Sequence, residues 1–361
     1  MKDSASQKFF VKKILTWNEF DNKREMPWKG EKDPYKIWLS EIILQQTRVE
    51  QGLAYYNRFI LQYPTVKHLA KAPETAIFKL WEGLGYYTRC KNLIATAKYI
   101  SVELKGQFPD QYEDILALKG IGPYTAAAIG SFAFNLSHAV VDGNVFRVLS
   151  RFFGIATPID STEGKKEFTA LANILLDKKQ PGIYNQALMD FGAIVCKPQL
   201  PLCNECVLQS NCHAYQHNLI NVLPIKEKSI KKKTRWFYFL LVEYKGALYV
   251  RKRGAKDIWE NLYEFILIEN EAALPLEDLS SLEQIKKIFK GVPYEITQIS
   301  KPYKQLLTHQ AIHGQFIKIK ASKPLLLNDY ELVRPDEIAK LPFPKFITSY
   351  LRDKNVSLNL L

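Results

Sequence analysis

Four of the chain's five cysteines lie within seventeen residues, and this cluster constrains the fold more than any other feature of the sequence. They are Cys196, Cys203, Cys206 and Cys212, separated by six, two and five residues. Four thiolates this close together can surround one soft-metal centre, either a zinc ion or a [4Fe–4S] cube. Structural zinc sites more often pair two CxxC motifs, and this segment holds only one, so the spacing favours the cube. Buried free thiols are the plain alternative, but they do not explain why the cysteines gather in one proline-containing loop.

Composition bounds the number of domains and the kind of partner. The 361 residues are 47% hydrophobic, which is enough for two medium cores, so we expect two domains. Fifty Lys and Arg against thirty-seven Asp and Glu leave a net charge of +13. This excess favours a polyanion partner such as nucleic acid, although a merely basic protein would show it too. The sequence holds no run of eighteen apolar residues and no evident secretory signal. We expect a cytoplasmic monomer with no membrane span, in a reducing compartment that suits clustered thiols.

The spacing of apolar residues changes along the chain and divides it into domains. Apolar residues recur at helical spacing through most of the first 215 residues, which predicts an all-α domain over 1–219. The helical stretches are 9–20, 38–62, 74–82, 89–103, 111–118, 123–134, 143–153, 165–177 and 184–196. Residues 220–235 carry six Lys or Arg and one Glu, and we interpret them as a basic linker.

Beyond the linker the pattern becomes that of strands. A hairpin is expected over 235–253, where two aromatic and β-branched runs flank Lys245-Gly246. Further strands are expected at 262–268, 294–300 and 314–320, and helices near 280–290 and 344–352. The sequence therefore predicts a smaller α+β domain over 236–361.

A glycine-rich turn joins two of the helical stretches. Gly120 and Gly122 allow a tight backbone turn that a Cβ would obstruct, and Pro123 can begin the next helix. Backbone N–H groups at such a helix N-terminus suit a phosphate. The pattern predicts a helix-hairpin-helix DNA-binding element, with an ordinary turn between helices as the alternative.

Two carboxylates occupy positions that suit catalysis as well as a structural role. Asp142 precedes a helix, where an N-cap is its default structural role and the helix dipole keeps it ionised. Glu41 lies inside an apolar stretch; read alone, it is a first-turn glutamate that favours its helix dipole. If Glu41 is buried instead, its pKa rises and it can hold a proton near neutrality. One protonated and one ionised carboxyl group are what cleavage of a glycosidic bond needs.

Taken together, these motifs resemble one family of enzymes. The segments are LSEIILQQTRV, GLGYYTR, GIGPYTA, VDGNV, NQALMDFGAIVC and the cysteine loop. In this order, over about residues 8–215, they resemble the helix-hairpin-helix DNA glycosylases, and within them the MutY family of adenine DNA glycosylases. The related endonuclease III branch carries a lysine where this chain has Tyr124. Without that amine a Schiff base with the sugar has no obvious nucleophile, so we expect a monofunctional glycosylase.

The resemblance implies a role for each matching residue. Glu41 would protonate adenine, Asp142 would stabilise the oxocarbenium-like sugar, and Tyr124 and Asn144 would help to orient it. The pocket for an adenine flipped out of the duplex would be formed by Arg24, Trp28 and Leu44. The residues that enter the helix beside the target pair would be Gln46, Thr47 and Tyr86. The helix-hairpin-helix glycines would be Gly120 and Gly122, and the four clustered cysteines would hold a structural [4Fe–4S] cluster.

The C-terminal domain resembles the Nudix-like domain of the same family, which reads 8-oxoguanine in the opposite strand. The segment IWENLYEF carries this resemblance, and no carboxylate-rich metal box follows, so we expect no pyrophosphatase activity. The family's recognition loop often reads Phe-Ser-His, whereas this chain has Leu307-Thr308-His309. The hydroxyl and the imidazole are kept and the aromatic ring is lost. An ordinary surface turn is the alternative interpretation of Thr308 and His309.

The leading hypothesis is an enzyme of base excision repair in a bacterial-like, nucleoid-associated setting. It would hydrolyse the N-glycosidic bond of adenine opposite 8-oxoguanine, and more weakly opposite guanine, in double-stranded DNA. One rival is a bifunctional glycosylase for oxidised pyrimidines, against which Tyr124 and the extra domain argue. Another is a non-catalytic, redox-responsive iron–sulfur DNA-binding protein. Against that rival stand Glu41 and Asp142, both at catalytic motif positions.

Overall fold

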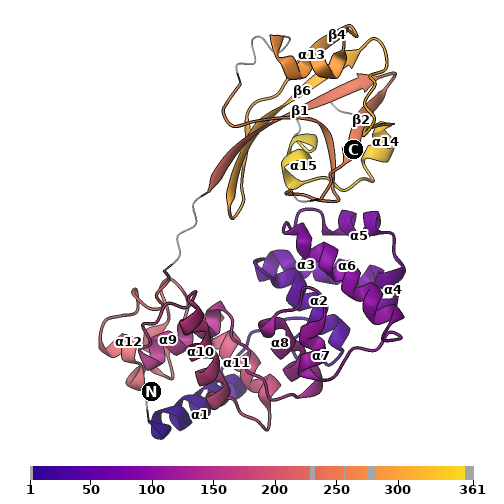
Figure 1. The fold of residues 1–361 in the computed structure, drawn as a ribbon. Coiled ribbons are helices and arrows are strands. Elements are labelled where there is room, and N and C mark those ends of the chain that lie inside the picture. The colour runs from indigo at the N-terminus through magenta and orange to yellow at the C-terminus, as the bar shows by residue number, and fades with distance from the viewer. Residues whose placement is uncertain (1–2, 228–231, 256, 275–280, 354–361) are drawn as a thin grey trace. The chain divides into compact units, whose positions relative to one another are not determined.

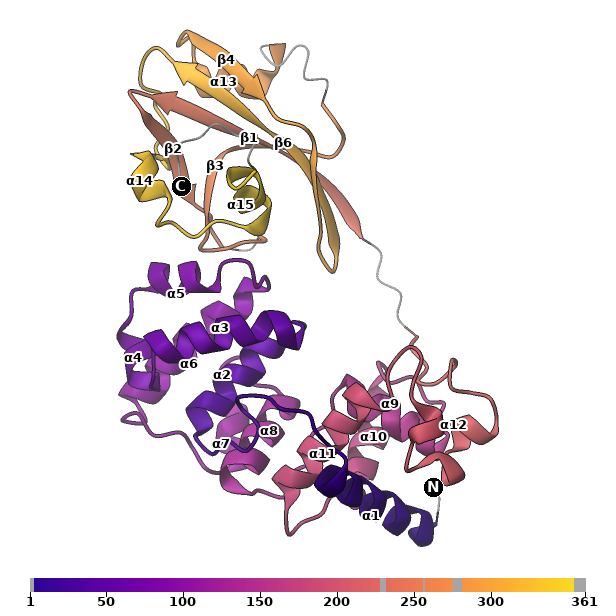
Figure 2. The same cartoon turned by 180° about the vertical axis from the view of Figure 1, so that it is seen from behind.

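The chain folds into two compact units (Figures 1 and 2). The computed structural model describes residues 3–227, 232–255, 257–274 and 281–353. The first unit comprises residues 1–71 and 92–229, and the second comprises residues 72–91 and 230–361. Part of the expected linker, residues 228–231, lies outside the described residues. The domain boundaries at 1–219, 220–235 and 236–361 therefore stay a prediction.

The first unit is built from helices, as expected. They are α1 (Ser4–Phe20), α2 (Pro34–Leu44), α3 (Val49–Gln62), α4 (Val66–Lys71), most of α6 (Tyr87–Val102), α7 (Tyr112–Ala117), α8 (Pro123–Phe134), α9 (Gly143–Phe153), α10 (Thr162–Leu175), α11 (Pro181–Ile194) and α12 (His213–Gln216), with the 3-10 turns Cys203–Glu205 and Gln209–Asn211. Helix α5 (Glu74–Trp81) and the start of α6 belong to the second unit. No helix among the described residues is both long enough and apolar enough to cross a membrane.

One expected helix is two helices in the structure. The apolar spacing over 38–62 is continuous, but α2 ends at Leu44 and α3 begins at Val49. Gln46 between them has a φ of 56°, in the left-handed region that a helix cannot continue through. Apolar residues on both sides of the break keep the helical spacing, so periodicity could not reveal it. The short α4 was also not predicted.

Aromatic side chains from α1, α9 and α11 form part of the core of the first unit. Phe10 lies 4.9 Å from Phe152 between ring centroids, and Trp17 lies 5.0 Å from Phe191. All four rings are at most 5% exposed. Burial of this size anchors α9 firmly, and α9 carries Asp142 at its N-terminus.

The second unit contains a seven-stranded sheet in the order β4-β6-β1-β3-β2-β7, with β5 paired to β6. The strands are β1 (Lys233–Tyr244), β2 (Ala247–Lys252), β3 (Tyr263–Asn270), β4 (Tyr294–Ile299), β5 (Tyr303–Leu306), β6 (Gln310–Ala321) and β7 (Glu331–Val333). Strands β1 and β6 pair in parallel, and the other pairs are antiparallel. The helices are α13 (Glu283–Phe289), α14 (Pro335–Ile338) and α15 (Lys345–Leu351).

This arrangement confirms the expected all-α followed by α+β organisation. Tyr238 and Leu240 of β1 pack in one cluster with Phe289 of α13, whereas Phe239 packs against Phe346 of α15. Because successive side chains of a strand point to opposite faces, α13 and α15 cover opposite faces of the sheet. Strands β5 and β7 and helix α14 were not predicted, since three or four residues carry too little pattern.

The two glycines of the turn between α7 and α8 differ in backbone conformation and in steric surroundings. Gly120 has a φ of 81°, and a Cβ there would lie 2.6 Å from the Asn92 side chain. Gly122 has a φ of −104° and no atom within 4 Å of a Cβ position. The expectation that a Cβ would obstruct the turn therefore holds at Gly120 and is wrong at Gly122.

We predict that Gly120→Ala destabilises the protein by about 1–2 kcal/mol, because alanine must adopt a left-handed φ. Gly122→Ala serves as the matched control and should change the free energy of unfolding by less than about 0.5 kcal/mol. Thermal unfolding followed by far-UV circular dichroism measures both. Equal midpoints for the two variants would contradict the steric difference between the two positions.

Candidate active site

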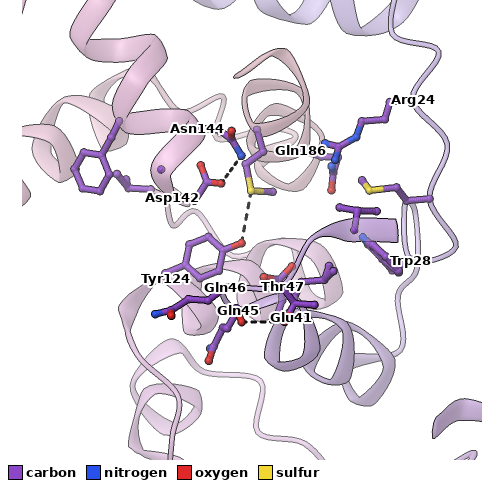
Figure 3. Close-up of a pocket in the computed structure, with 17 residues that line it drawn as sticks. Arg24, Trp28, Glu41, Gln45, Gln46, Thr47, Tyr124, Asp142, Asn144 and Gln186 are labelled. Carbon is purple, nitrogen blue, oxygen red and sulfur yellow. Dashed lines mark hydrogen bonds between the residues drawn. The ribbon is translucent and has the colours of Figure 1, made fainter. Parts of the chain in front are cut away.

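A cavity of about 430 Å³ opens in the first unit beside α2, α8 and α9 (Figure 3). Its volume falls in the range of roughly 300–1,000 Å³ that is usual for small-ligand pockets. It is lined by Arg24, Met26, Trp28, Glu41, Leu44, Gln45, Gln46, Thr47, Val49, Tyr124, Val141, Asp142, Gly143, Asn144, Phe146, Gln186 and Met189. Nine of the residues proposed from the sequence therefore share one cavity, although they come from four separate stretches of the chain.

Glu41 reaches the cavity from the second half of α2. The helix begins at Pro34, and the Asp33 side chain caps it by accepting a hydrogen bond from the Tyr35 N–H at 2.9 Å. Glu41 is therefore not a first-turn glutamate, and that interpretation is wrong. A carboxylate toward a helix C-terminus is disfavoured by the helix dipole. The Glu41 side chain is nevertheless buried, since the residue is only 7% exposed.

Burial gives Glu41 an unusual acidity. Loss of contact with water raises its pKa, a hydrogen bond with Tyr124 lowers it in part, and the nearby negative charge of Asp142 raises it; the net pKa is about 7. A carboxyl group with a pKa near 7 is protonated in about half of the molecules at neutral pH. Glu41 can therefore act as an acid there, which an exposed glutamate cannot.

Asp142 caps the N-terminus of α9 from the other side of the cavity (Figure 3). One carboxylate oxygen accepts a hydrogen bond from the Val145 N–H at 2.8 Å, and the other accepts one from the Asn144 amide at 2.7 Å. Burial raises the pKa of Asp142, and these hydrogen bonds and the charge of Arg147 lower it in part. The net direction of the shift is upward.

Tyr124 lies between the two carboxyl groups in the view of Figure 3. Its hydroxyl donates to the Met189 sulfur at 3.8 Å and also interacts with Glu41. Burial and both acidic neighbours raise the pKa of the phenol well above its usual value, so it stays protonated. None of the described residues that line the cavity is a lysine. The pocket thus offers a neutral hydroxyl where a Schiff base would require an amine.

An ion-pair cluster holds the wall of the cavity around Arg24. The fully buried Asp190 of α11 accepts hydrogen bonds from Arg24 at 2.8 Å and from the Gln186 amide at 2.9 Å. Lys29 lies 3.3 Å from the same carboxylate. Sequence reasoning missed Gln186 and Asp190. The four-residue spacing of these polar side chains within the apolar run NQALMDFGAIVC was the signal that could have found them.

Arg147 of α9 ties the Asp142 turn to the start of the cysteine loop. Its guanidinium donates to the Cys196 carbonyl at 2.8 Å, to the Gly192 carbonyl at 2.7 Å and to the Asn144 side-chain oxygen at 2.8 Å. Asn144 in turn donates to Asp142. The backbone at Cys196 and the carboxylate of Asp142 are therefore connected through two side chains.

The four clustered cysteines border a second, separate cavity, together with Leu202, Tyr215 and other residues. Arg151 donates a hydrogen bond to the Cys196 sulfur at 3.5 Å. Cys90, the fifth cysteine, is fully buried in α6. Four thiols around one space are a donor set that fits a soft-metal centre.

The remaining proposed residues do not line the catalytic cavity. Gly120 and Gly122 lie in the turn before α8, and Tyr86, Thr308 and His309 belong to the second unit. Within that unit the hydroxyl groups of Tyr86 and Thr308 form a hydrogen bond. Thr308 and the exposed His309 occupy the turn between β5 and β6, which the Leu307 N–H closes by donating to the Gln310 carbonyl at 2.8 Å.

Comparisons with known proteins agree with this geometry. Residues 39–173 match the HhH-GPD superfamily of base excision DNA repair proteins, and residues 237–353 match the NUDIX domain. An adenine DNA glycosylase of Buchnera aphidicola from Baizongia pistaciae is 39% identical over 258 residues, which cover 71% of this chain and 73% of the relative. The chain belongs to the adenine DNA glycosylase family. This membership makes it a DNA N-glycosylase. The adenine DNA glycosylase of Rattus norvegicus is 40% identical over 223 residues, covering 59% of this chain and 43% of the rat protein.

Solved structures share the fold of the glycosylase domain. A thermostable thymine-DNA glycosylase superposes with a TM-score of 0.55 at 32% identity, covering 59% of this chain and 98% of its own. Endonuclease III in a non-covalent DNA complex superposes with a TM-score of 0.53 at 19% identity, covering 61% and 99%. The second likeness, at this low identity, shows the fold alone.

The raised pKa of Glu41 predicts a pH-dependent cost of folding. Below pH 4.5, the ordinary pKa of the group, both the folded and the unfolded chain hold the proton and burial costs no charge. Stability then falls as the pH rises toward 7, and above pH 7 the full penalty of about 3 kcal/mol is present. Glu41→Gln carries no charge at any pH, so it should escape this fall.

The measurement is the difference in thermal midpoint between Glu41→Gln and wild type. This difference should be more positive at pH 8 than at pH 5 by on the order of 5–10 °C. Glu50→Gln is the control, because Glu50 is exposed on α3, and it should show no such change. An equal difference for Glu41→Gln at both pH values would mean that Glu41 is not buried as a proton-holding acid.

Proposed function

We propose that this protein removes adenine that is mispaired with 8-oxoguanine, and more slowly adenine opposite guanine, from double-stranded DNA. It would be a monofunctional glycosylase of base excision repair that leaves an intact abasic strand. The observation that carries this proposal is the shared cavity in which a buried Glu41, with a pKa of about 7, stands near the helix-capping Asp142. The names of the relatives, adenine DNA glycosylases, support adenine as the base.

The two carboxyl groups divide the chemistry between them. With adenine flipped into the cavity, protonated Glu41 would give its proton to a ring nitrogen, so that the base leaves as a neutral molecule. As the bond between sugar and base breaks, positive charge develops on the sugar. The ionised Asp142 would stabilise that charge, held in place by Val145 and Asn144. A water molecule would then add to the sugar carbon, and the proton that it releases would return to a carboxylate of the cavity, which completes the hydrolysis.

The other lining residues would bind and orient the flipped base. Arg24, Trp28 and Leu44 would form the adenine pocket, and Asp190 fixes Arg24 there through the buried ion pair. Tyr124 and Asn144 would orient the reacting groups. Gln46 and Thr47, in the break between α2 and α3, and Tyr86 would enter the DNA helix in place of the flipped base. Both Gln46 and Tyr86 have left-handed φ angles, of 56° and 49°, as expected for side chains at tight turns.

Glu41→Gln and Asp142→Asn should each reduce single-turnover adenine release by at least about 10³-fold. The amide at position 41 supplies no acidic proton, and the amide at 142 supplies no negative charge. Both variants should still bind the mispaired duplex in a gel-shift assay, which separates loss of chemistry from loss of binding. Glu50→Gln is again the control and should retain the wild-type rate. A near-normal rate for either carboxyl variant would refute the two-carboxylate mechanism.

We propose that Cys196, Cys203, Cys206 and Cys212 hold a [4Fe–4S] cluster. Their side chains border one common cavity, which supports a shared centre. The four cysteines include only one CxxC motif, flanked by two single cysteines, and this spacing favours a cube over a structural zinc ion. The cluster would be structural, with Arg147 connecting its loop to the catalytic turn.

The purified protein should be brown and contain about four irons per chain. Cys203→Ser should lower the iron content and the thermal stability of the protein. Cys90→Ser should leave the iron content unchanged, since Cys90 is buried in α6 away from the loop. Metal analysis and the visible absorption spectrum measure both effects. A colourless, active protein with one zinc ion would contradict the cluster proposal.

We propose that the turn at Thr308 and His309 reads the base opposite adenine. The exposure of His309 and the polar side chains at the end of the β5–β6 hairpin support this role. The fold match to the NUDIX domain does not imply its chemistry, and we expect no pyrophosphatase activity. We further propose that the protein acts as a monomer on the chromosomal DNA of a bacterial-like nucleoid.

Duplexes containing A opposite 8-oxoguanine, A opposite G, T opposite G and thymine glycol test the substrate directly, each with and without alkali. We expect release of adenine alone, and strand breaks only after alkali. The double change Thr308→Ala and His309→Ala should reduce the preference for 8-oxoguanine over guanine about tenfold, as two hydrogen bonds at roughly 0.5–1.5 kcal/mol each imply. Gln298→Ala, an exposed control in β4, should keep the preference. Unchanged discrimination in the double variant would move lesion reading elsewhere.

A further inference from the structure

One segment of the glycosylase sequence packs with the C-terminal domain. Residues 72–91 lie inside the stretch 39–173 that matches the glycosylase superfamily, but the structure groups them with residues 230–361. The segment contains α5, the loop after it and the first residues of α6, including Tyr86. The C-terminal domain therefore packs against this segment of the glycosylase sequence.

Glu82, at the end of α5, makes the most buried polar contact in this packing. Its side chain is only 5% exposed. One carboxylate oxygen accepts a hydrogen bond from the Phe343 N–H at 3.1 Å and pairs with Lys79 at 3.0 Å. The other oxygen pairs with Arg352 at 3.2 Å. A buried carboxylate is tolerated only with such partners, so its position fixes theirs.

The partners of Glu82 are themselves tied into the core of the second unit. Phe343 is 1% exposed and stacks on Phe265 of β3, with ring centroids 5.4 Å apart. The Pro342 carbonyl next to it accepts a hydrogen bond from the Tyr263 N–H at 2.8 Å. Arg352 directly follows α15, which covers one face of the sheet. Glu82 therefore connects α5 to both the sheet and its covering helix.

Two further contacts of the segment are weaker. Lys79 donates to the Leu341 carbonyl at 3.0 Å, and Lys91 pairs with Glu260 at 2.6 Å. The Lys91 and Glu260 side chains are 44% and 28% exposed, and pairs so accessible to water contribute little. The buried carboxylate of Glu82 thus dominates the polar part of this contact.

Hydrogen bonds restrain the loop between Glu82 and Tyr86. We therefore expect a displacement of Glu82 to displace Tyr86 as well. The Trp81 indole N–H and the Arg89 guanidinium both donate to the Gly85 carbonyl, at 3.0 and 3.3 Å. The Arg89 guanidinium also lies 5.5 Å from the Tyr86 ring centroid. Tyr86 then contacts Thr308 through its hydroxyl. The contact of Glu82 and the contact of Tyr86 thus place the same loop against the C-terminal domain at two points.

We propose that Glu82 anchors the C-terminal domain to the segment 72–91 and thereby positions the turn at Thr308 and His309 relative to Tyr86. Glu82 is a positioning residue in this proposal: it touches no substrate, and it acts on the choice between guanine and 8-oxoguanine. The inference about specificity rests on the proposed function of that turn. The anchor itself rests on the packing of the second unit alone.

Hydrogen–deuterium exchange on the full chain tests the anchor without any substrate. In Glu82→Ala the Phe343 N–H loses its acceptor, and its exchange should accelerate roughly tenfold. Glu82→Gln keeps an acceptor oxygen and should accelerate exchange less. The control is Glu337→Ala, which removes an exposed ion pair with Lys340 close to the same segment and should have no effect. Exchange in Glu82→Ala within twofold of wild type would overturn the anchor.

Single-turnover rates on A opposite 8-oxoguanine and on A opposite G test the effect on specificity. In Glu82→Ala the ratio of the two rates should fall about tenfold, while the rate on A opposite G stays within twofold of wild type. Faster exchange with an unchanged ratio would overturn the positioning role and leave the anchor. If wild type itself shows no preference for 8-oxoguanine, the lesion-reading proposal fails and the specificity role of Glu82 with it, while the exchange result still decides the anchor.

Discussion

The cost of burying charge at one cavity governs the chemistry of this protein. Glu41 and Asp142 both lose water, and burial raises the pKa of each. They differ in what compensates the charge. Asp142 receives hydrogen bonds from a helix N-terminus and from Asn144. Glu41 lies toward the C-terminus of its helix, where the helix dipole disfavours a carboxylate. Burial therefore brings the pKa of Glu41 to about 7, whereas at Asp142 hydrogen bonds offset part of the upward shift.

The difference between Glu41 and Asp142 arises mainly from their positions at opposite ends of two helices. The aromatic core that holds α9 fixes where Asp142 stands, and the cap fixes how its oxygens point. Asp190 of α11 pairs with the lining residue Arg24 and accepts a hydrogen bond from Gln186, so a second buried carboxylate shapes the pocket through its partners. Buried acids thus have two uses here. Asp190 is surrounded by hydrogen-bond donors, whereas Glu41 has a pKa of about 7 and can hold a proton near neutral pH.

The sequence predicted most of the fold because its signals are local. Helical spacing, Pro123 at a helix start and the aromatic hairpin around Lys245-Gly246 all act within a few residues. The break at Gln46 escaped, since apolar residues continue on both sides of it. The pocket members taken from the family resemblance lie together, but Asp190 was missed because its partner Arg24 lies 166 residues away in the sequence. No local pattern announces such a contact, nor the packing of residues 72–91 with the C-terminal domain.

Several acidic side chains of the Nudix-like domain are engaged in ion pairs with arginines. Glu264 of β3 is 1% exposed and pairs with both Arg251 and Arg253. Asp257 pairs with Arg253 and with Arg235. Carboxylates neutralised by guanidinium groups are poor ligands for a divalent cation, because the cation would have to displace a strong charge-assisted contact. The pairs of Asp257 connect it to Arg235 of β1 and to Arg253, which directly follows β2. In this domain, buried acidic side chains serve the packing of the sheet.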